Sequence, residues 1–268
     1  MRKTLLGTSV LALSIGCKPP PQAPDRLEEL CAYVFHHMGD DVDEDGRMLE
    51  FEAGIENLDA WLEKGDNLAS TTEGYQITAL EDEAVDALDL DSARGTDELI
   101  GAAVAIRHGY GSKRIAYATV VADWAEVVPK NYKEYEREFD RGPGCFTDRE
   151  CTELEASAYG LSSWAGLVDV ETWNDIQFRW VETDIGWVVA HRSWLVEPAI
   201  VSWDGIDVFA QYFLAVTLPA GEGKTTRVMA TWIDSDYGAL PVSEDFAKSQ
   251  IVTSMQNQGE AVNDFLAD

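Results

Sequence analysis

The sequence predicts an α+β protein: a helix–loop–helix, then an antiparallel sheet, then a long C-terminal helix that closes the sheet. Apolar residues recur at helical spacing on both sides of an acidic loop within residues 25–65. Residues 159–232 hold several stretches rich in Trp, Val, Ile and Phe, separated by short turns. A second helical stripe runs from Ala247 to Leu266. With 268 residues, 46% of them hydrophobic, the chain is long enough for one large domain with a small appendage.

The first two helices flank the acidic loop. Asp25 can cap the first helix, whose apolar stripe is Leu27, Leu30, Cys31, Val34, Phe35 and Met38. The stripe of the second helix is Phe51, Ile55, Leu58 and Leu62. We therefore predict a helix–loop–helix unit over residues 25–65, and a larger α+β domain over residues 66–268 that begins after a polar joint at residues 67–74.

The loop between these helices resembles an EF-hand. It offers oxygen ligands at the positions that this motif uses, namely the side chains of Asp41, Asp43, Asp45 and Glu52 and the carbonyl of Arg47. Gly46 stands where the loop must turn sharply. The resemblance implies that Ca²⁺ is the cofactor. Since no second loop of the chain fits the motif, we expect a modest dissociation constant, on the order of 0.1–1 mM. The alternative is an acidic turn that binds no metal tightly.

The N-terminus predicts export and lipid anchoring. Arg2 and Lys3 precede an apolar run, which is typical of a signal peptide over residues 1–16. The run ends in Ser-Ile-Gly-Cys, which resembles a bacterial lipobox and implies a lipidated Cys17. Residues 17–24 are rich in proline and predict an extended tether. The expected location is the bacterial cell envelope, with the chain anchored through its lipid to a membrane, by our prediction the outer one.

The charge of the chain excludes several classes of partner. There are 49 acidic and 20 basic residues, a formal net charge of -29. Nucleic acid and anionic lipid surfaces would both repel such a chain. We therefore predict no nucleic-acid partner.

The larger domain reads as mixed elements followed by a run of strands. Predicted strands are residues 75–80, 101–108, 159–168, 176–181, 188–195, 208–218 and 227–232. Tyr132–Phe139 has the spacing of a short helix, and Ile115–Val121 fits either a helix or a strand. Ser243 can cap the last helix, whose stripe is Ala247, Ile251, Met255, Gly259, Val262 and Leu266.

This order of elements resembles the helix-grip fold of START-like and SRPBCC domains. In that family the last helix lies across a curved sheet and encloses a cavity for lipids or other hydrophobic ligands. This resemblance implies a hydrophobic small-molecule ligand. Together with the EF-hand and lipobox resemblances, it leads us to expect a non-enzymatic, calcium-binding envelope lipoprotein. One alternative is a structural or interaction lipoprotein with a purely stabilising calcium site. A second is a hydrolase or isomerase with His108 or His191 as base, which would need a carboxylate beside that histidine in the cavity.

The cysteines divide into three roles. Cys145 and Cys151 are close in sequence, and in an oxidising envelope this pair predicts a disulfide. Cys31 lies on an apolar helical stripe and predicts a buried thiol. A metal site at the histidines is not expected, because His36 and His37 are adjacent on a helix and do not easily face one ion.

Overall fold

A computed structural model of the chain describes residues 21–44, 46–88, 90, 95–164, 168–238 and 242–268. The helices are α1 Leu27–His37, α2 Leu49–Leu62, α3 Asn67–Glu73, α4 Asp82–Asp86, α5 Ser112–Thr119, α6 Trp124–Val127, α7 Gly144–Asp148 and α8 Glu244–Ala267. The strands are β1 Tyr75–Ile77, β2 Ile100–His108, β3 Tyr132–Phe139, β4 Glu153–Trp164, β5 Val168–Thr183, β6 Gly186–Leu195, β7 Ile200–Val201, β8 Asp207–Pro219 and β9 Thr225–Asp236. No helix among these residues is long and apolar enough to cross a membrane.

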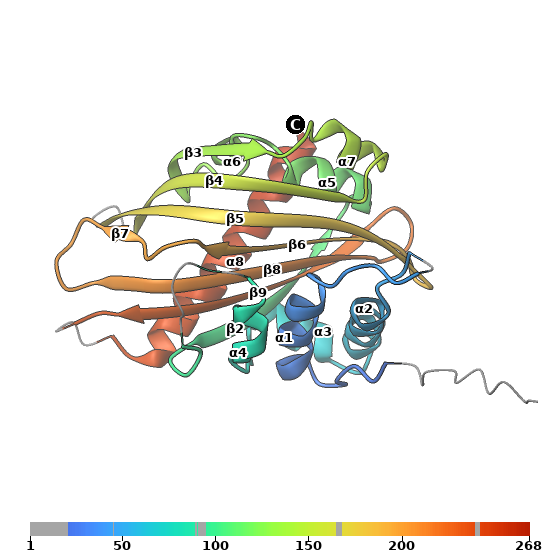
Figure 1. The fold of residues 1–268 in the computed structure, drawn as a ribbon, viewed down its shortest axis with the longest axis horizontal. Helices are drawn as coiled ribbons and strands as arrows, with labels where there is room; N and C mark the ends of the chain where they lie inside the picture. Colours follow the sequence, from blue (N-terminus) through green and yellow to red (C-terminus); the bar gives the residue numbers. More distant parts are fainter. Residues whose placement is uncertain (1–20, 45, 89, 91–94, 165–167, 239–241) are drawn as a thin grey trace, which may run out of the picture.

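The strands of the described residues form one antiparallel sheet. Its order is β1-β2-β9-β8-β6-β5-β4-β3, with the short β7 beside β5 (Figure 1). The meander from β4 to β6 and the β8–β9 hairpin were both predicted from alternating residues and turn signals. The three-residue β1 and the eight-residue β3 form the two edges of this order. The predicted α+β class, with a large antiparallel sheet and a C-terminal helix, is confirmed.

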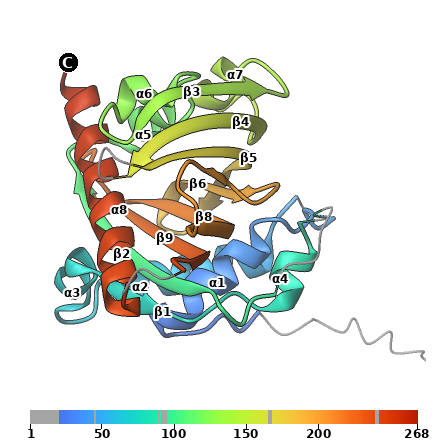
Figure 2. The same ribbon diagram turned by 90° about the vertical axis from the view of Figure 1, so that its left-hand side faces the viewer.

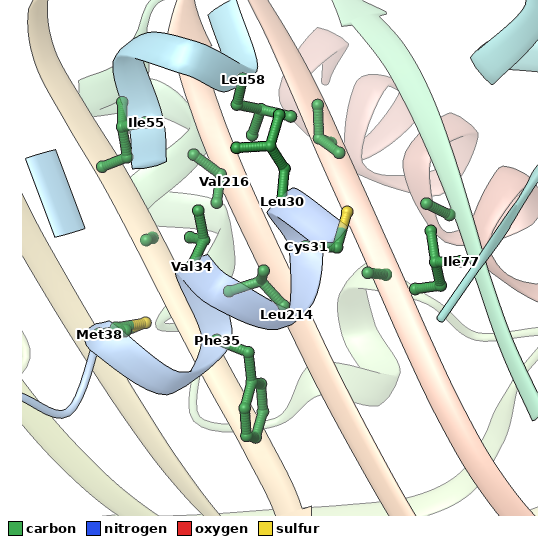
Figure 3. Close-up of a cluster of buried hydrophobic side chains, with 14 of the residues drawn as sticks. Leu30, Cys31, Val34, Phe35, Met38, Ile55, Leu58, Ile77, Leu214 and Val216 are labelled. Atoms are coloured by element: carbon green, nitrogen blue, oxygen red, sulfur yellow. The ribbon is translucent and has the colours of Figure 1, made fainter. Parts of the chain in front are cut away.

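The helical pair α1–α2 covers one face of the sheet. Buried residues of both helices share a single apolar cluster with the sheet, in which Leu30 and Phe35 of α1 are fully buried (Figure 3). Each buried Leu or Phe side chain contributes about 1.5–3 kcal/mol. Because side chains alternate along a strand, Ala103 and Ala105 of β2 meet this cluster, while Ala102 and Val104 face the other way. The two helices therefore rest directly on the sheet.

Helix α8 covers the opposite face, behind the strands in Figure 1 and across them in Figure 2. Ser243 caps it as predicted, accepting a hydrogen bond from the backbone N–H of Phe246. Its buried residues are the six of the predicted stripe: Ala247, Ile251, Met255, Gly259, Val262 and Leu266. A Cβ atom at Gly259 would overlap the side chain of Ile106 on β2. The absence of a side chain at Gly259 therefore lets α8 lie close to the sheet.

The prediction of a helix at Tyr132–Phe139 was wrong, because this segment is the edge strand β3 paired with β4. A bulge between Tyr132 and Glu134 shifts the register, and the rings of Tyr132 and Tyr135 lie 4.9 Å apart between centroids. The bulge thus gives a strand the three-residue apolar spacing of a helix. The ambiguous segment Ile115–Val121 lies mostly in α5, and the polar joint holds the short helix α3.

Candidate functional site

A cavity of about 340 Å³ lies between the sheet and α8. Ligand sites in proteins occupy roughly 300–1,000 Å³. Strands β3, β4, β5, β6, β8 and β9 form its walls together with α8. Its larger apolar and aromatic lining residues are Trp124, Tyr132, Tyr135, Val170, Ile176, Val208, Phe213, Ile233, Tyr237, Ile251 and Met255. Polar residues are interspersed among them, including Asn131, Asn174, His191, Ser193, Gln211, Ser254 and Gln258.

The charge lining this cavity is positive, against the sign of the whole chain. None of the described residues that line it is Asp or Glu, and Arg137 on β3 is its one cation. Arg137 donates from Nη1 to the Thr119 carbonyl at 2.7 Å and from Nη2 to the Tyr135 hydroxyl at 3.0 Å. Its Nε is buried without a hydrogen-bond partner among the described residues. The cavity is therefore suited to a ligand with an acceptor or an anionic group.

A second arginine lies beneath α8 in the same sheet. Arg227 on β9 has an exposed fraction of 0%. It stands two residues before Met229, which packs under α8, and so it shares that face. None of its three side-chain nitrogens has a hydrogen-bond partner among the described residues. Burial lowers the pKa of Arg227 to about 10, so the side chain stays charged at neutral pH.

The two histidines named as candidate bases have different surroundings. His191 on β6 lines the cavity, and burial, with the charges of Arg227 and Arg137, holds its pKa well below the usual value. His108 on β2 is not among the lining residues. Its Nδ1 lies 2.9 Å from Oδ1 of Asn263 on α8, and burial with the charge of Arg227 lowers its pKa to about 4. Neither histidine has a carboxylate beside it in the cavity lining, which the hydrolase or isomerase alternative requires.

The acidic loop lies between α1 and α2, as predicted. Gly46 has a φ of 77°, the left-handed conformation that the motif needs. Asp43 Oδ1 accepts from the Arg47 backbone N–H at 2.8 Å, and the Arg47 carbonyl accepts from the Asp43 N–H at 2.8 Å. Asp41 is described and exposed, whereas Asp45 lies outside the described residues.

Glu52 is held by groups other than a metal in this arrangement. It has an exposed fraction of 4%. Its Oε2 pairs with the Arg47 guanidinium, and its Oε1 accepts from the Met48 backbone N–H at 3.2 Å. The oxygen donors of the loop suit calcium, but Arg47 must release Glu52 before Glu52 can bind an ion with both oxygens. The described loop residues are thus compatible with calcium after one side chain moves.

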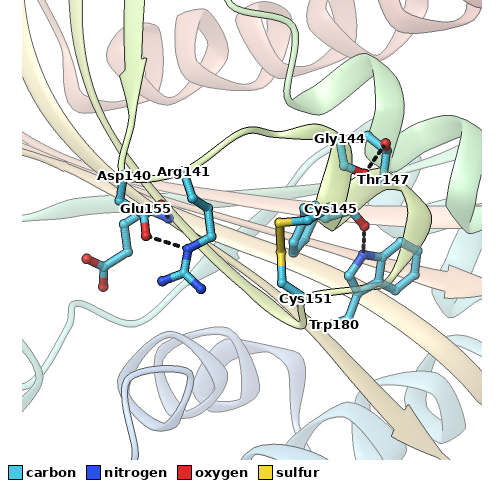
Figure 4. Close-up of a disulfide and its surroundings, with 9 residues drawn as sticks. Asp140, Arg141, Gly144, Cys145, Thr147, Cys151, Glu155 and Trp180 are labelled. Carbon is cyan, nitrogen blue, oxygen red and sulfur yellow. Dashed lines mark hydrogen bonds and ion pairs between the residues drawn. A yellow bond between two sulfur atoms is a disulfide. The ribbon is translucent and has the colours of Figure 1, made fainter.

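The cysteine predictions stand as follows. Cys145 and Cys151 form a disulfide, which confirms that prediction (Figure 4). The adjoining Phe146 carbonyl accepts from Trp180 Nε1 at 2.8 Å, which ties this turn to β5. Cys31 is a buried free thiol, and burial raises its pKa to about 12. Cys17 and the signal and lipobox residues lie outside the described residues.

Sequence reasoning did not find Arg137 or Arg227. Arg137 stood in a segment predicted as a helix, and the alternation along the strand would have placed it on the same face as Tyr135 once β3 was recognised. Arg227 stands at the start of a strand where a charged residue is commonly exposed. Only its pairing with Ile106 of β2 and Thr217 of β8 fixes it in the centre of the sheet.

No family model and no curated protein sequence matches the chain. Several solved structures are similar to it. A STAR-related lipid transfer protein from Xanthomonas axonopodis is 10% identical with a TM-score of 0.43, over 66% of this chain and 97% of that chain. The lipid transfer and protein localization domain of human StarD13 is 10% identical with a TM-score of 0.41, over 79% and 95%. An aromatase/cyclase from Streptomyces is 11% identical with a TM-score of 0.39, over 63% and 91%. All three likenesses have TM-scores below 0.5 and concern the fold alone.

Proposed function

We propose that this chain binds a small amphipathic molecule, neutral or anionic, in the cavity between the sheet and α8. The observation that carries the proposal is the lining, in which aromatic and aliphatic side chains alternate with hydrogen-bonding groups and no carboxylate is present among the described residues. Apolar walls favour a hydrocarbon or ring body. Arg137 and the nearby buried charge of Arg227 favour an acceptor or anionic head and disfavour a cationic one.

Binding, rather than catalysis, is the simpler use of this cavity. A general base needs a pKa near the working pH. The depressed pKa of His191 makes it a weak base, although its neutral ring can exchange hydrogen bonds with a ligand. The hydrolase or isomerase alternative gains no support from these contacts. A purely structural protein needs no cavity large enough for a ligand, so the structural alternative leaves this cavity unexplained.

Three decyl compounds test the proposal by calorimetric titration below their micelle concentrations: decanoate, decanol and decylamine. We expect decanoate and decanol to bind and decylamine to bind at least tenfold more weakly. Ser254→Trp should weaken binding, because Ser254 lines the cavity. Thr253→Trp is the matched control, since Thr253 is exposed on the same helix, as Ser254 is, but is not part of the lining. Absence of binding to the wild type, or equal binding by both variants, would refute the proposal.

Calcium binding by the acidic loop is a separate part of the proposed function. The helices on both sides, the conformation of Gly46 and the buried carboxylate of Glu52 support it. Calcium should raise the melting temperature of the wild type, and Glu52→Gln should remove that rise. Arg47→Ala should strengthen calcium binding, because it frees Glu52 from its ion pair. A wild type whose melting temperature does not respond to calcium contradicts this part.

Anchoring in the bacterial envelope through Cys17 completes the proposal. A lipid at this position would hold the domain near a membrane on the tether of residues 17–24. Mass spectrometry of the mature N-terminus tests it, with acylation of Cys17 expected. An unmodified Cys17 would leave the cavity proposal intact and remove the anchor.

A further inference from the structure

Three side chains with metal-binding atoms converge at the carboxyl end of α1. His36, His37 and Asp40 each offer one ligand atom, and these atoms lie within 4.8 Å of one another. The Nδ1–H of His37 donates to Asp40 Oδ2 at 2.7 Å. The two imidazole rings are 4.7 Å apart between centroids, at an interplanar angle of 83°. Adjacent histidines were not expected to share an ion, yet the last turn of α1 brings their rings together.

The imidazole of His36 has an unused coordination atom. Its Nδ1 is buried and has no hydrogen-bond partner among the described residues. A buried ring nitrogen without a partner is unfavourable unless something else satisfies it. A neutral imidazole offers its lone pair to a metal ion as readily as to a proton donor. A bound ion would supply the partner that this nitrogen lacks among the described residues.

We propose that His36, His37 and Asp40 form a three-ligand site for a divalent transition metal ion of the zinc class. Two imidazoles and a carboxylate are the donors that such ions prefer. In a tetrahedral site with bonds of about 2.1 Å, neighbouring ligand atoms stand about 3.4 Å apart. When the ion binds, His37 Nδ1 loses its proton to solvent and its hydrogen bond to Asp40 is replaced by the two metal bonds. The His37 and Asp40 atoms then separate by less than about 1 Å from their present 2.7 Å to reach that spacing. This site is distinct from the cavity under α8.

The backbone of this site is fixed by two arginines of the sheet. Arg192 on β6 donates from Nη1 to the carbonyl of Phe35 at 2.7 Å and to that of His36 at 3.3 Å. Arg179 on β5 donates from Nη1 to the Asp40 carbonyl at 2.9 Å. The two guanidinium groups are directed at backbone carbonyl oxygens at the end of α1. A helix C-terminus favours a nearby cation. The backbone that carries His36 and Asp40 is thus held in place before an ion arrives.

The surroundings leave room for further ligands. A pocket of about 440 Å³ borders His36 and His37, and Glu29, Glu81 and Glu83 also line it. These carboxylates lower the electrostatic cost of a divalent cation, and a water can take an open coordination position. The nitrogen donors set the site apart from the adjacent loop, whose donors are all oxygen. We therefore expect zinc here and calcium in the loop.

Zinc titration of the chain, purified without a polyhistidine tag, tests this site by calorimetry. We expect one zinc ion per chain, and visible absorption bands when Co²⁺ replaces zinc. His37→Gln and Asp40→Asn should each weaken zinc binding at least tenfold, and the His36→Gln/His37→Gln variant should lose it. A millimolar excess of calcium should leave zinc binding unchanged.

Two control variants separate this site from other metal-binding groups. Glu52→Gln removes a calcium ligand, and Cys31→Ala removes the free thiol; both should bind zinc as the wild type does. Circular dichroism should show that every variant retains the fold. Failure of the wild type to bind zinc would overturn the proposal. So would full zinc affinity in the His36→Gln/His37→Gln variant, or loss of zinc binding in Glu52→Gln.

Discussion

Replacing Arg227 by methionine should stabilise the ligand-free protein. Burial lowers the pKa of this arginine well below its usual value, to about 10. Since each pKa unit corresponds to about 1.4 kcal/mol, the buried charge costs roughly 3 kcal/mol at neutral pH. The depressed folded-state pKa means that this cost is present in full below pH 10 and declines only above it. Methionine keeps the apolar stem and removes the charge, and imperfect packing of its thioether returns up to about 1.5 kcal/mol.

The net gain in free energy of unfolding should be about 1–3 kcal/mol at pH 7. A chain of this size gains about 2–4 °C in melting temperature per kcal/mol, so a rise of about 2–12 °C is expected by calorimetry. Arg107→Met is the matched control, since Arg107 is an exposed arginine on β2, and it should change stability by less than about 0.5 kcal/mol. A loss of more than 1 kcal/mol in Arg227→Met would mean that the guanidinium has a stabilising partner, and would refute the reasoning.

The remaining predictions concern packing, acid stability and the disulfide. Gly259→Ala should lose about 1–3 kcal/mol, because its Cβ overlaps Ile106. Adding Ile106→Ala to Gly259→Ala should relieve the overlap, so the double variant should lose less stability in urea unfolding than the two single variants together. A loss equal to the sum of the two single losses would contradict the contact. His108 has a pKa of about 4 in the folded state, below its usual 6.5. Between pH 6.5 and pH 4 only the unfolded chain binds a proton at this residue, so the free energy of unfolding should fall by about 3 kcal/mol across this range. His108→Gln should flatten this dependence of the urea midpoint on pH, and an unchanged slope would assign it elsewhere. Cys145→Ser with Cys151→Ser should lose about 2 kcal/mol, measured without reductant, and an unchanged midpoint would contradict a stabilising role.

The sequence predicted best those elements whose pattern is local. All six residues of the α8 stripe are buried, since a helix with one apolar face can satisfy it only by packing. Ser243 was recognisable as a cap because a cap acts within three residues. Strand β3 was missed because a bulge changes the period of its side chains, and a period of three is also helical. Local spacing cannot separate these two cases.

The candidate site depended on contacts between distant residues. Tyr132 and His191 lie 59 positions apart and line one cavity because four strands, β3 to β6, follow one another across the sheet. Arg227 became a buried cation only through its neighbours on β2 and β8. The convergence of His36 and His37 depends on side-chain conformations at the end of α1, and helical periodicity gives no information about them.

The two edges of the open sheet have a consequence for how the protein behaves at high concentration. Any exposed strand edge offers unpaired N–H and C=O groups to a second molecule. Strand β1 is only three residues long, so its edge offers few such groups. On β3 the exposed side chains include Glu134, Glu136 and Glu138, which alternate along the strand. If two β3 edges paired, the glutamates of one strand would face those of the other and repel them. This repulsion disfavours self-association through β3 at neutral pH. Acidification or high salt would weaken the repulsion.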